Sequence, residues 1–248
     1  MKEINFDTYK FRCSAMGKII SKSGKLIEGN KTYLREYYIG EINDIKKDIS
    51  SKYFDKGNLC EQDAMDILGQ ALYPFPKIVK SFKKHLSNDF IQGTPDVVKD
   101  DYLYDIKNAY DRFTFANAEK SWEYEWQIKA YLWLTGKTKG RLFYTLTNMP
   151  EELLQDEERK LFYSHRPKFI STEQKEYLEA CEELRKKLDF TKMAIHERFK
   201  LWEIELTESD IETMKTAVIN GRNYMKQLHE EQLDLYNQNL ELMIQARK

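Results

Sequence analysis

The stretch FIQGTPDVVKDDYLYDIKNA, residues 90–109, decides how the middle of this chain folds. Two short runs rich in aromatic and β-branched residues, Phe90 to Val98 and Tyr102 to Ala109, flank the polar residues 99–101. Runs of this composition, separated by a few polar residues, are typical of two strands joined by a turn. The sequence therefore predicts a β-hairpin over this stretch.

The hairpin places carboxylates where they can act together. Side chains alternate along a strand, so Asp105 and Lys107 point to the same face. Asp96 stands near the end of the preceding strand, where strand pairing can bring its carboxylate beside that of Asp105. Neighbouring carboxylates repel each other unless a cation neutralises them, and Mg²⁺ is a hard cation that prefers oxygen ligands. The sequence therefore predicts a magnesium site, to which the carbonyl of Ile106 would add an oxygen.

Lys107 can take part in catalysis at such a site. Beside a metal ion it can orient or deprotonate an attacking water molecule and stabilise the charge of a phosphorane. The alternative is a surface hairpin with alternating charges, because a DxK triplet alone is common. The combination of Pro95-Asp96 with Asp105-Ile-Lys107 on a predicted hairpin favours the metal site.

A helix predicted over about Asn58 to Leu72, ended by Tyr73-Pro-Phe-Pro, lies ahead of the hairpin. Its Glu61 can reach the metal directly or through water. Asp63 and Asp66 on the same helix are alternatives that the residue pattern leaves open.

A second amphipathic helix, predicted over about Ala116 to Leu134 and ended by Thr135-Gly136, follows the hairpin. Gln127 and Tyr131 are four residues apart and share one face of it. The uncharged amide of Gln127 can position water or a phosphate oxygen without changing the charge of the site. Tyr131 can support the helix or touch a DNA backbone, although a tyrosine on an apolar helix face is more often part of the core.

Mixed helices and strands make up the rest of the chain. The pattern predicts a short helix at 14–20 with Ser14 as N-cap, a loop at 21–31, a helix at 32–47, a strand at 141–147, helices at 151–161 and 172–188, a strand at 199–206, and a final helix from a Thr207 cap to about 239. This order describes an α/β or α+β fold, a small mixed sheet flanked by helices. On the final helix we expect Arg222 and Lys226 to be solvated.

The composition fits a single globular domain of 248 residues, with 41% apolar and 33% charged residues. No stretch approaches the roughly 18 consecutive apolar residues of a membrane helix, so we expect no transmembrane helix, and the first residues lack the apolar run that we would expect of a signal peptide. Cys13, Cys60 and Cys181 are too far apart for a metal-ligand pattern, so we expect free thiols and a reducing cytoplasm. No HExxH or P-loop pattern is present.

Basic residues concentrate near the N-terminus although the net charge is only −1. Between Thr8 and Arg35 the chain has seven basic residues and one acid. Screening limits the reach of distant acids to about 10 Å, so a local patch can attract a phosphate backbone. An ordinary solvated surface would show the same pattern.

The ordered set of Glu61, GTPD (93–96), DIK (105–107) and QIKAY (127–131) resembles the RecB-like branch of the PD-(D/E)XK nucleases. It is similar in particular to the YqaJ and phage lambda exonuclease group of viral recombination nucleases. FRCSAMGKI (11–19) is similar to that group's N-terminal segment, which implies that Arg12 and Ser14 contact substrate phosphate. The resemblance covers residues 10–147, and Asp105 stands where many members have glutamate.

This resemblance implies a restriction-endonuclease-like core at about 10–147, with a C-terminal elaboration at about 151–248 in the same domain. It implies an Mg²⁺-dependent deoxyribonuclease, with Mn²⁺ as a substitute, in which Glu61, Asp96, Asp105 and the Ile106 carbonyl hold the metal. Lys107 and Gln127 would complete the catalytic set, and Tyr131 would join Arg12 and Ser14 in substrate binding. The expected substrate is a duplex DNA end.

The sequence is compatible with several functions of this fold. The group's usual role is resection of duplex ends so that a single-strand annealing protein can load on the exposed strand. A restriction-type or structure-specific endonuclease, or a DNA-binding protein that keeps the fold without cutting, would share the same residues. A homo-oligomer is compatible with the sequence, and no membrane partner is expected.

Overall fold

The computed structural model describes residues 4–45, 51–73, 85–165 and 168–247. Its centre is a four-stranded sheet with the order β4-β5-β6-β7, formed by β4 (Val97–Lys99), β5 (Tyr102–Asn108), β6 (Lys139–Thr145) and β7 (Phe199–Glu205). β5 and β6 run parallel, while β4 and β7 pair antiparallel with their neighbours. The predicted hairpin turn and the mixed sheet are therefore confirmed.

The first predicted strand of the hairpin, Phe90 to Val98, is not continuous. Its first half, β3 (Ile91–Gly93), belongs to a separate three-stranded sheet with β1 (Phe11–Arg12) and β2 (Leu86–Ser87). Proline has no N–H to donate to a ladder, so Pro95 interrupts the strand before β4 begins at Val97. The interruption matters because it releases Asp96 from strand pairing.

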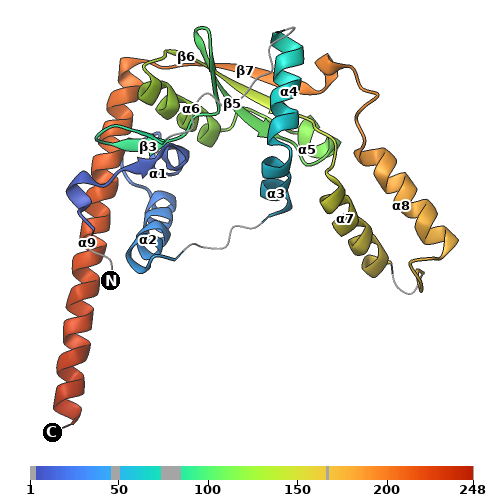
Figure 1. Cartoon of the computed structure of the whole chain (residues 1–248). Helices are drawn as coiled ribbons and strands as arrows, with labels where there is room; N and C mark the ends of the chain where they lie inside the picture. The colour runs from blue at the N-terminus through green and yellow to red at the C-terminus, as the bar shows by residue number, and fades with distance from the viewer. Residues whose placement is uncertain (1–3, 46–50, 74–84, 166–167, 248) are drawn as a thin grey trace.

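Helices cover both faces of the central sheet (Figure 1). On one face, α6 (Trp122–Thr135) packs Ile128 and Leu132 with Leu103 and Leu142. On the other face, α4 (Glu61–Leu72) packs Met65, Ile67 and Leu68 with Val97, Tyr104 and Phe143. Because neighbouring strand residues point to opposite faces, Asp105 and Lys107 lie on the face that α6 covers.

The predicted helix positions hold, but several boundaries move. The segment predicted as a loop up to residue 31 already forms the start of α2 (Glu28–Asn43). Asn30 causes this early start, since its side chain accepts a hydrogen bond from Ile27 N at 3.0 Å and donates one to the Lys18 carbonyl at 2.7 Å. α2 ends at Asn43, earlier than predicted. Residue 47 and residues 74–76, where the predictions ended two helices, lie outside the described ranges.

Serine and aspartate caps explain the other differences. Ser51 caps α3 (Lys52–Leu59), which precedes α4, whereas the prediction had a single helix that began only at about Asn58. Asp111 caps α5 (Arg112–Ala116), and Ser121 caps α6 at Trp122, six residues later than expected at 116. Ser14 is not a cap. It lies inside the 3-10 helix η2 (Cys13–Ala15), which continues into α1 (Met16–Ile19).

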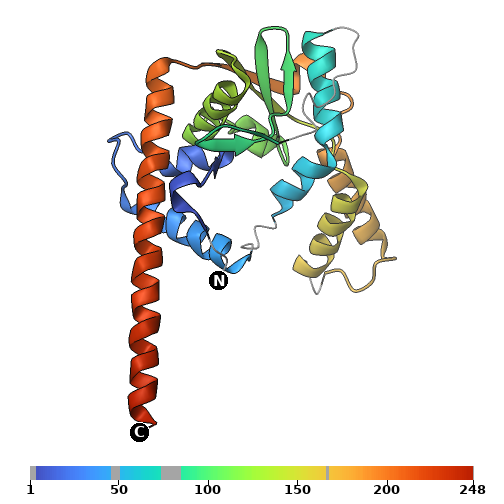
Figure 2. The ribbon, with the colours of Figure 1, turned by 60° about the vertical axis from the view of Figure 1, so that its left-hand side comes forward.

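The C-terminal elements follow the prediction closely. They are α7 (Glu151–Ser164), α8 (Lys175–Leu188), η3 (Ile195–Glu197), β7 and α9 (Glu208–Ala246), and η1 (Phe6–Thr8) precedes β1 near the N-terminus. Thr207 caps α9 as predicted, because its hydroxyl accepts a hydrogen bond from Asp210 N at 3.2 Å. Figures 1 and 2 show the far end of α9 extending away from the rest of the described chain.

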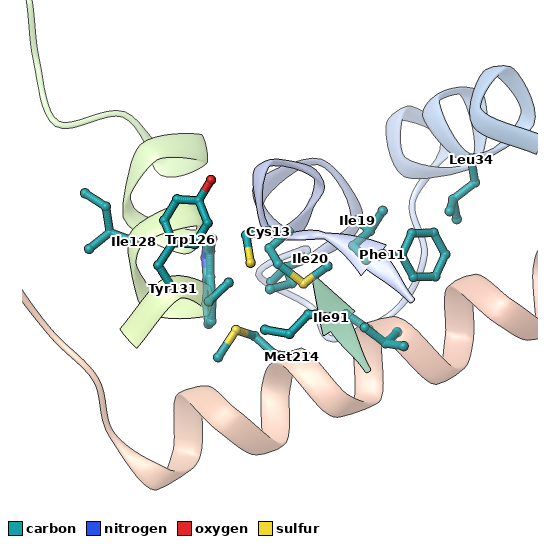
Figure 3. Packing of buried hydrophobic residues seen from close by; sticks show 14 of the residues in the cluster. Phe11, Cys13, Ile19, Ile20, Leu34, Ile91, Trp126, Ile128, Tyr131 and Met214 are labelled. Atoms are coloured by element: carbon teal, nitrogen blue, oxygen red, sulfur yellow. The ribbon is translucent and has the colours of Figure 1, made fainter. Parts of the chain in front are cut away.

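The main core lies between α6, α1, α2 and α9, and part of it is shown in Figure 3. Phe11, Leu34 and Met214 are fully buried there. The expectation that Arg222 is solvated is wrong, because its guanidinium donates hydrogen bonds to the carbonyls of Tyr9 at 2.8 Å and Asp89 at 2.5 Å. These bonds hold α9 against the residues ahead of β1 and against the turn between β2 and β3.

Cys13, Cys60 and Cys181 are buried free thiols. In the described part of the chain, no helix combines the length and the apolar character that a membrane span requires.

Candidate active site

One pocket of about 530 Å³ collects most of the residues that the sequence singled out. It is lined from β5 by Asp105, Ile106 and Lys107, and from α6 by Gln127 and Tyr131. Asp96, just ahead of β4, and Glu61, the first residue of α4, complete this set. Residues separated by up to 70 positions in sequence therefore face one cavity.

Asp96 is fixed by its own side chain. Its Oδ2 accepts a hydrogen bond from Ile106 N at 3.0 Å. In a regular hairpin a backbone carbonyl would accept this bond, but the strand interruption at Pro95 leaves the carboxylate to do so. Because the N–H and C=O of one strand residue point to the same side, the Ile106 carbonyl is also directed toward Asp96.

Asp105 is the buried centre of the pocket, with 1% of its surface exposed. Its Oδ1 accepts a hydrogen bond from Gln127 Nε2 at 3.2 Å, and its Oδ2 lies 2.8 Å from Lys107 Nζ. Asp105 Oδ2 is therefore ion-paired with Lys107. Burial lowers the pKa of Lys107, but the carboxylates of Asp105 and Asp96 outweigh that effect and raise it.

These donors fit a divalent cation. Asp96, Asp105 and Glu61 line the pocket together with one lysine, Lys107, and neighbouring carboxylates repel each other unless cations neutralise them. Magnesium is usually held by one or two carboxylates together with water and substrate phosphate. Asp96, Asp105 and the Ile106 carbonyl supply such a set.

Glu61 lines the same pocket, whereas Asp63 and Asp66 are not among the lining residues. The structure therefore selects Glu61 from the three acids of this helix. Within the described ranges, His, Cys, Asp and Glu side chains form no group of three or more that could hold a metal ion. The contact of Glu61 with the metal, directly or through water, stays a prediction.

Tyr131 forms a wall of the pocket and is buried, with 9% of its surface exposed (Figure 3). It packs against Gly93, where an added Cβ would lie 2.8 Å from the Tyr131 ring and 3.0 Å from Cys13 Sγ. Only glycine permits this approach between β3 and α6. Gln127 Nε2 lies 3.5 Å from the Tyr131 hydroxyl, and burial raises the pKa of Tyr131. Tyr131 therefore supports the position of Gln127.

Arg12 and Ser14 are exposed and lie outside this pocket. Arg12 lines a neighbouring depression together with Lys10, Glu41 and Gln92. η2, which holds Ser14, packs on α6 and β3, so the two depressions are separated by Cys13 and its neighbours. The predicted phosphate contacts of Arg12 and Ser14 stay predictions.

One wall of the pocket, formed by α3, was not predicted from the sequence. Tyr53, Phe54, Gly57 and Asn58 of α3 line it opposite α6. Starting the predicted helix at Asn58 excluded the first three of them. The missed signal was Ser51, whose hydroxyl accepts a hydrogen bond from Phe54 N at 3.2 Å and so begins the helix earlier.

Solved structures of exonucleases have a similar fold. The chain is similar to a phage-related exonuclease from Haemophilus somnus 129PT, with a TM-score of 0.69 and 22% identity over 91% of this chain and 97% of that one. It is also similar to the alkaline exonuclease LHK-Exo from Laribacter hongkongensis, with a TM-score of 0.57 and 14% identity over 95% and 96% of the two chains. For LHK-Exo in complex with dAMP, the TM-score is 0.56 and the identity 15%, over 94% of each chain.

No protein-family model and no curated protein matches the sequence. The structural likeness nevertheless extends over nearly the whole chain, including the helices after residue 150. The chain therefore has the fold of these exonucleases, and the resemblance drawn from its motifs is confirmed at the level of the fold.

Proposed function

We propose that this chain, which has an exonuclease fold, is a metal-dependent DNA exonuclease that hydrolyses phosphodiester bonds from duplex ends. The observation that supports the proposal most directly is the convergence of Asp96, Asp105, Lys107 and Gln127 on one pocket. A protein that only bound DNA would gain nothing from carboxylates placed where they repel the phosphate backbone. The names of the structural neighbours add support for an exonuclease.

Each residue has a distinct part in the proposed reaction. Asp96, Asp105 and the Ile106 carbonyl would hold Mg²⁺, which when bound supplies Lewis acidity at the scissile phosphate. Lys107 Nζ, 2.8 Å from Asp105 Oδ2, lies where it can orient the attacking water and stabilise charge on the phosphorus centre. Gln127 holds Asp105 Oδ1 and so keeps the carboxylate in one orientation. Glu61, which also lines the pocket, would bind a water molecule there.

End-labelled linear duplex and covalently closed circular DNA test the proposal together. With Mg²⁺ or Mn²⁺ we expect the linear duplex to be degraded and the closed circle to be spared, because only the former offers an end. Excess chelator should abolish degradation, and Ca²⁺ should support binding with little turnover, since its looser coordination positions water poorly. Rapid cutting of closed circles would favour an endonuclease, and full activity in chelator would contradict the metal mechanism.

Replacing Gln127 with alanine should slow cleavage less than loss of a metal ligand does. Gln127 touches Asp105 and not the predicted metal, and groups that orient ligands typically contribute about 10- to 100-fold. Single-turnover cleavage measures the effect, with Gln227→Ala on α9 as a control, because Gln227 bonds only Glu231 on the same helix in the described structure. A loss as large as that of Asp105→Asn would place Gln127 on the metal itself.

Replacing Arg12 with alanine should remove a preference for 5′-phosphorylated ends. A terminal phosphate monoester has more charge than an internal diester, and a guanidinium can bind it through two hydrogen bonds. The measurement compares cleavage of 5′-phosphate and 5′-hydroxyl duplexes. Arg35→Ala is the control, because its guanidinium belongs to the same basic stretch but already bonds the Tyr224 hydroxyl. If the Arg12 variant keeps the preference, Lys18 and Lys22 are the next candidates.

A further inference from the structure

Lys56, on α3, is fully buried at 0% exposure. Its ammonium donates three hydrogen bonds to backbone carbonyls, to Ala109 at 2.9 Å, Tyr110 at 2.9 Å and Thr147 at 2.8 Å. The buried ring of Phe190 lies 5.8 Å from Nζ. All three N–H donors of the lysine are thus used inside the protein, where none is left for a ligand.

The three carbonyls lie just beyond the carboxyl-terminal ends of the two parallel strands, β5 and β6. Ala109 and Tyr110 directly follow β5, and Thr147 follows β6 by two residues. Two further hydrogen bonds link the same two strand ends. Ala109 N donates to the Thr145 carbonyl at 2.8 Å, and Asn108 Nδ2 donates to Thr147 Oγ1 at 2.6 Å. Lys56 therefore binds the strand that holds Asp105 and Lys107 at the point where that strand leaves the pocket.

Residues of α3 that are close to Lys56 in sequence line the pocket itself. Tyr53, Phe54 and Gly57 line the cavity together with Asp105 and Lys107. One lysine thus connects the pocket wall formed by α3 with the strand that holds the proposed metal ligand. Displacement of α3 or of the end of β5 would change the width of the pocket between α3 and Asp105, where we propose that DNA binds.

Removing an ammonium from water costs free energy unless hydrogen bonds inside the protein compensate for the lost hydration. Desolvation lowers the pKa of Lys56 to about 8, so the side chain is mainly charged at neutral pH. A buried polar group is tolerated when hydrogen bonds satisfy it, and only a cation with three donors can satisfy three converging carbonyls at once. An apolar side chain would fill the space but would leave the carbonyls without this shared partner.

We propose that Lys56 is a positioning residue, whose buried ammonium acts as a built-in monovalent cation that fixes the ends of β5 and β6 against α3. This inference rests on the proposed nuclease function, because its effect is read through the geometry of Asp105 and Lys107. Lys56 touches neither of these residues. It acts through the backbone that follows them.

Three substitutions test this role. Lys56→Met keeps the apolar stem without the charge, Lys56→Ala removes the side chain beyond Cβ, and Lys56→Arg keeps a charge of different shape. We expect Lys56→Met to lower kcat about 10- to 100-fold per folded molecule, as for other groups that orient ligands, with KM for DNA little changed. Lys200→Met is the matched control, because Lys200 Nζ also joins two backbone carbonyls, those of Ala116 and Ala118, but lies outside the pocket lining.

Chemical rescue separates positioning from general stability. In Lys56→Ala, added n-propylammonium replaces the atoms that the substitution removes, and it should restore kcat, whereas n-propanol should not. Circular dichroism on each variant gives the folded fraction to which kcat is normalised. Recovery with the amine and not with the alcohol supports the proposal, as does a reduced kcat in folded Lys56→Arg.

Wild-type kcat per folded molecule in Lys56→Met would overturn the proposal, and so would equal losses in Lys56→Met and Lys200→Met. Failure of every Lys56 variant to fold, with or without amine, would assign the lysine to folding and reject the positioning role. The wild-type protein, measured beside the variants with Mg²⁺ and linear duplex, keeps the two proposals distinct. An inactive wild type contradicts the nuclease function, while an active wild type with equally active Lys56 variants contradicts this inference alone.

Discussion

Asp105→Asn is expected to reduce DNA cleavage by about a thousandfold or more, because charge stabilisation by a bound metal is worth several kcal/mol. Asp105 is the most buried acid of the pocket and one of its two proposed carboxylate ligands. Asparagine keeps the shape of the side chain and can still accept the hydrogen bond from Gln127, so folding should be preserved. Single-turnover cleavage measures the rate, and Mn²⁺ titration by calorimetry should show weakened metal binding.

Asp101→Asn is the matched control for this experiment. Asp101 is exposed in the turn between β4 and β5, so the same change of charge is made on the same hairpin away from the pocket. The control should cleave DNA at the wild-type rate. An ordinary rate in folded Asp105→Asn would mean that the metal site lies elsewhere.

Lys107→Ala is expected to lower the cleavage rate by about 10²- to 10⁴-fold, the range for a group that positions or transfers a proton in the transition state. Unlike Asp105→Asn, it should leave Mn²⁺ binding in place, because Lys107 is a partner of the carboxylate and not a proposed ligand. Loss of both cleavage and metal binding would assign Asp105 to the metal, while loss of cleavage alone would assign Lys107 to the reaction at the phosphate.

Lys139→Ala serves as the control for Lys107. Lys139 is an exposed lysine at the start of β6, at the opposite end of the strand pair from the pocket. It should cleave DNA normally. A Lys107 variant that cleaves at a similar rate would remove Lys107 from the mechanism and leave the carboxylates as the proposed chemical centre.

The sequence by itself determined the parts of this protein that depend on local rules. Strand alternation placed Asp105 and Lys107 on one face, and helical spacing placed Gln127 and Tyr131 together, because both periods are properties of the backbone. The Thr207 cap and the Gly136 end were predicted for the same reason, because both are local. Thr207 accepts a hydrogen bond from a backbone N–H in the first turn of α9, and Gly136 terminates α6.

Tertiary structure alone decided which of these residues meet and what holds them. Glu61 enters the pocket while Asp63 and Asp66 do not, since the direction of α4 is set by its packing on the sheet. Pro95 turned one expected strand into two, each with different partners. The roles of Arg222 and Lys56 were equally hidden, because their hydrogen bonds go to backbone carbonyls distant in sequence. A backbone carbonyl has no signature in the amino-acid pattern, so only the folded chain determines which cation binds it.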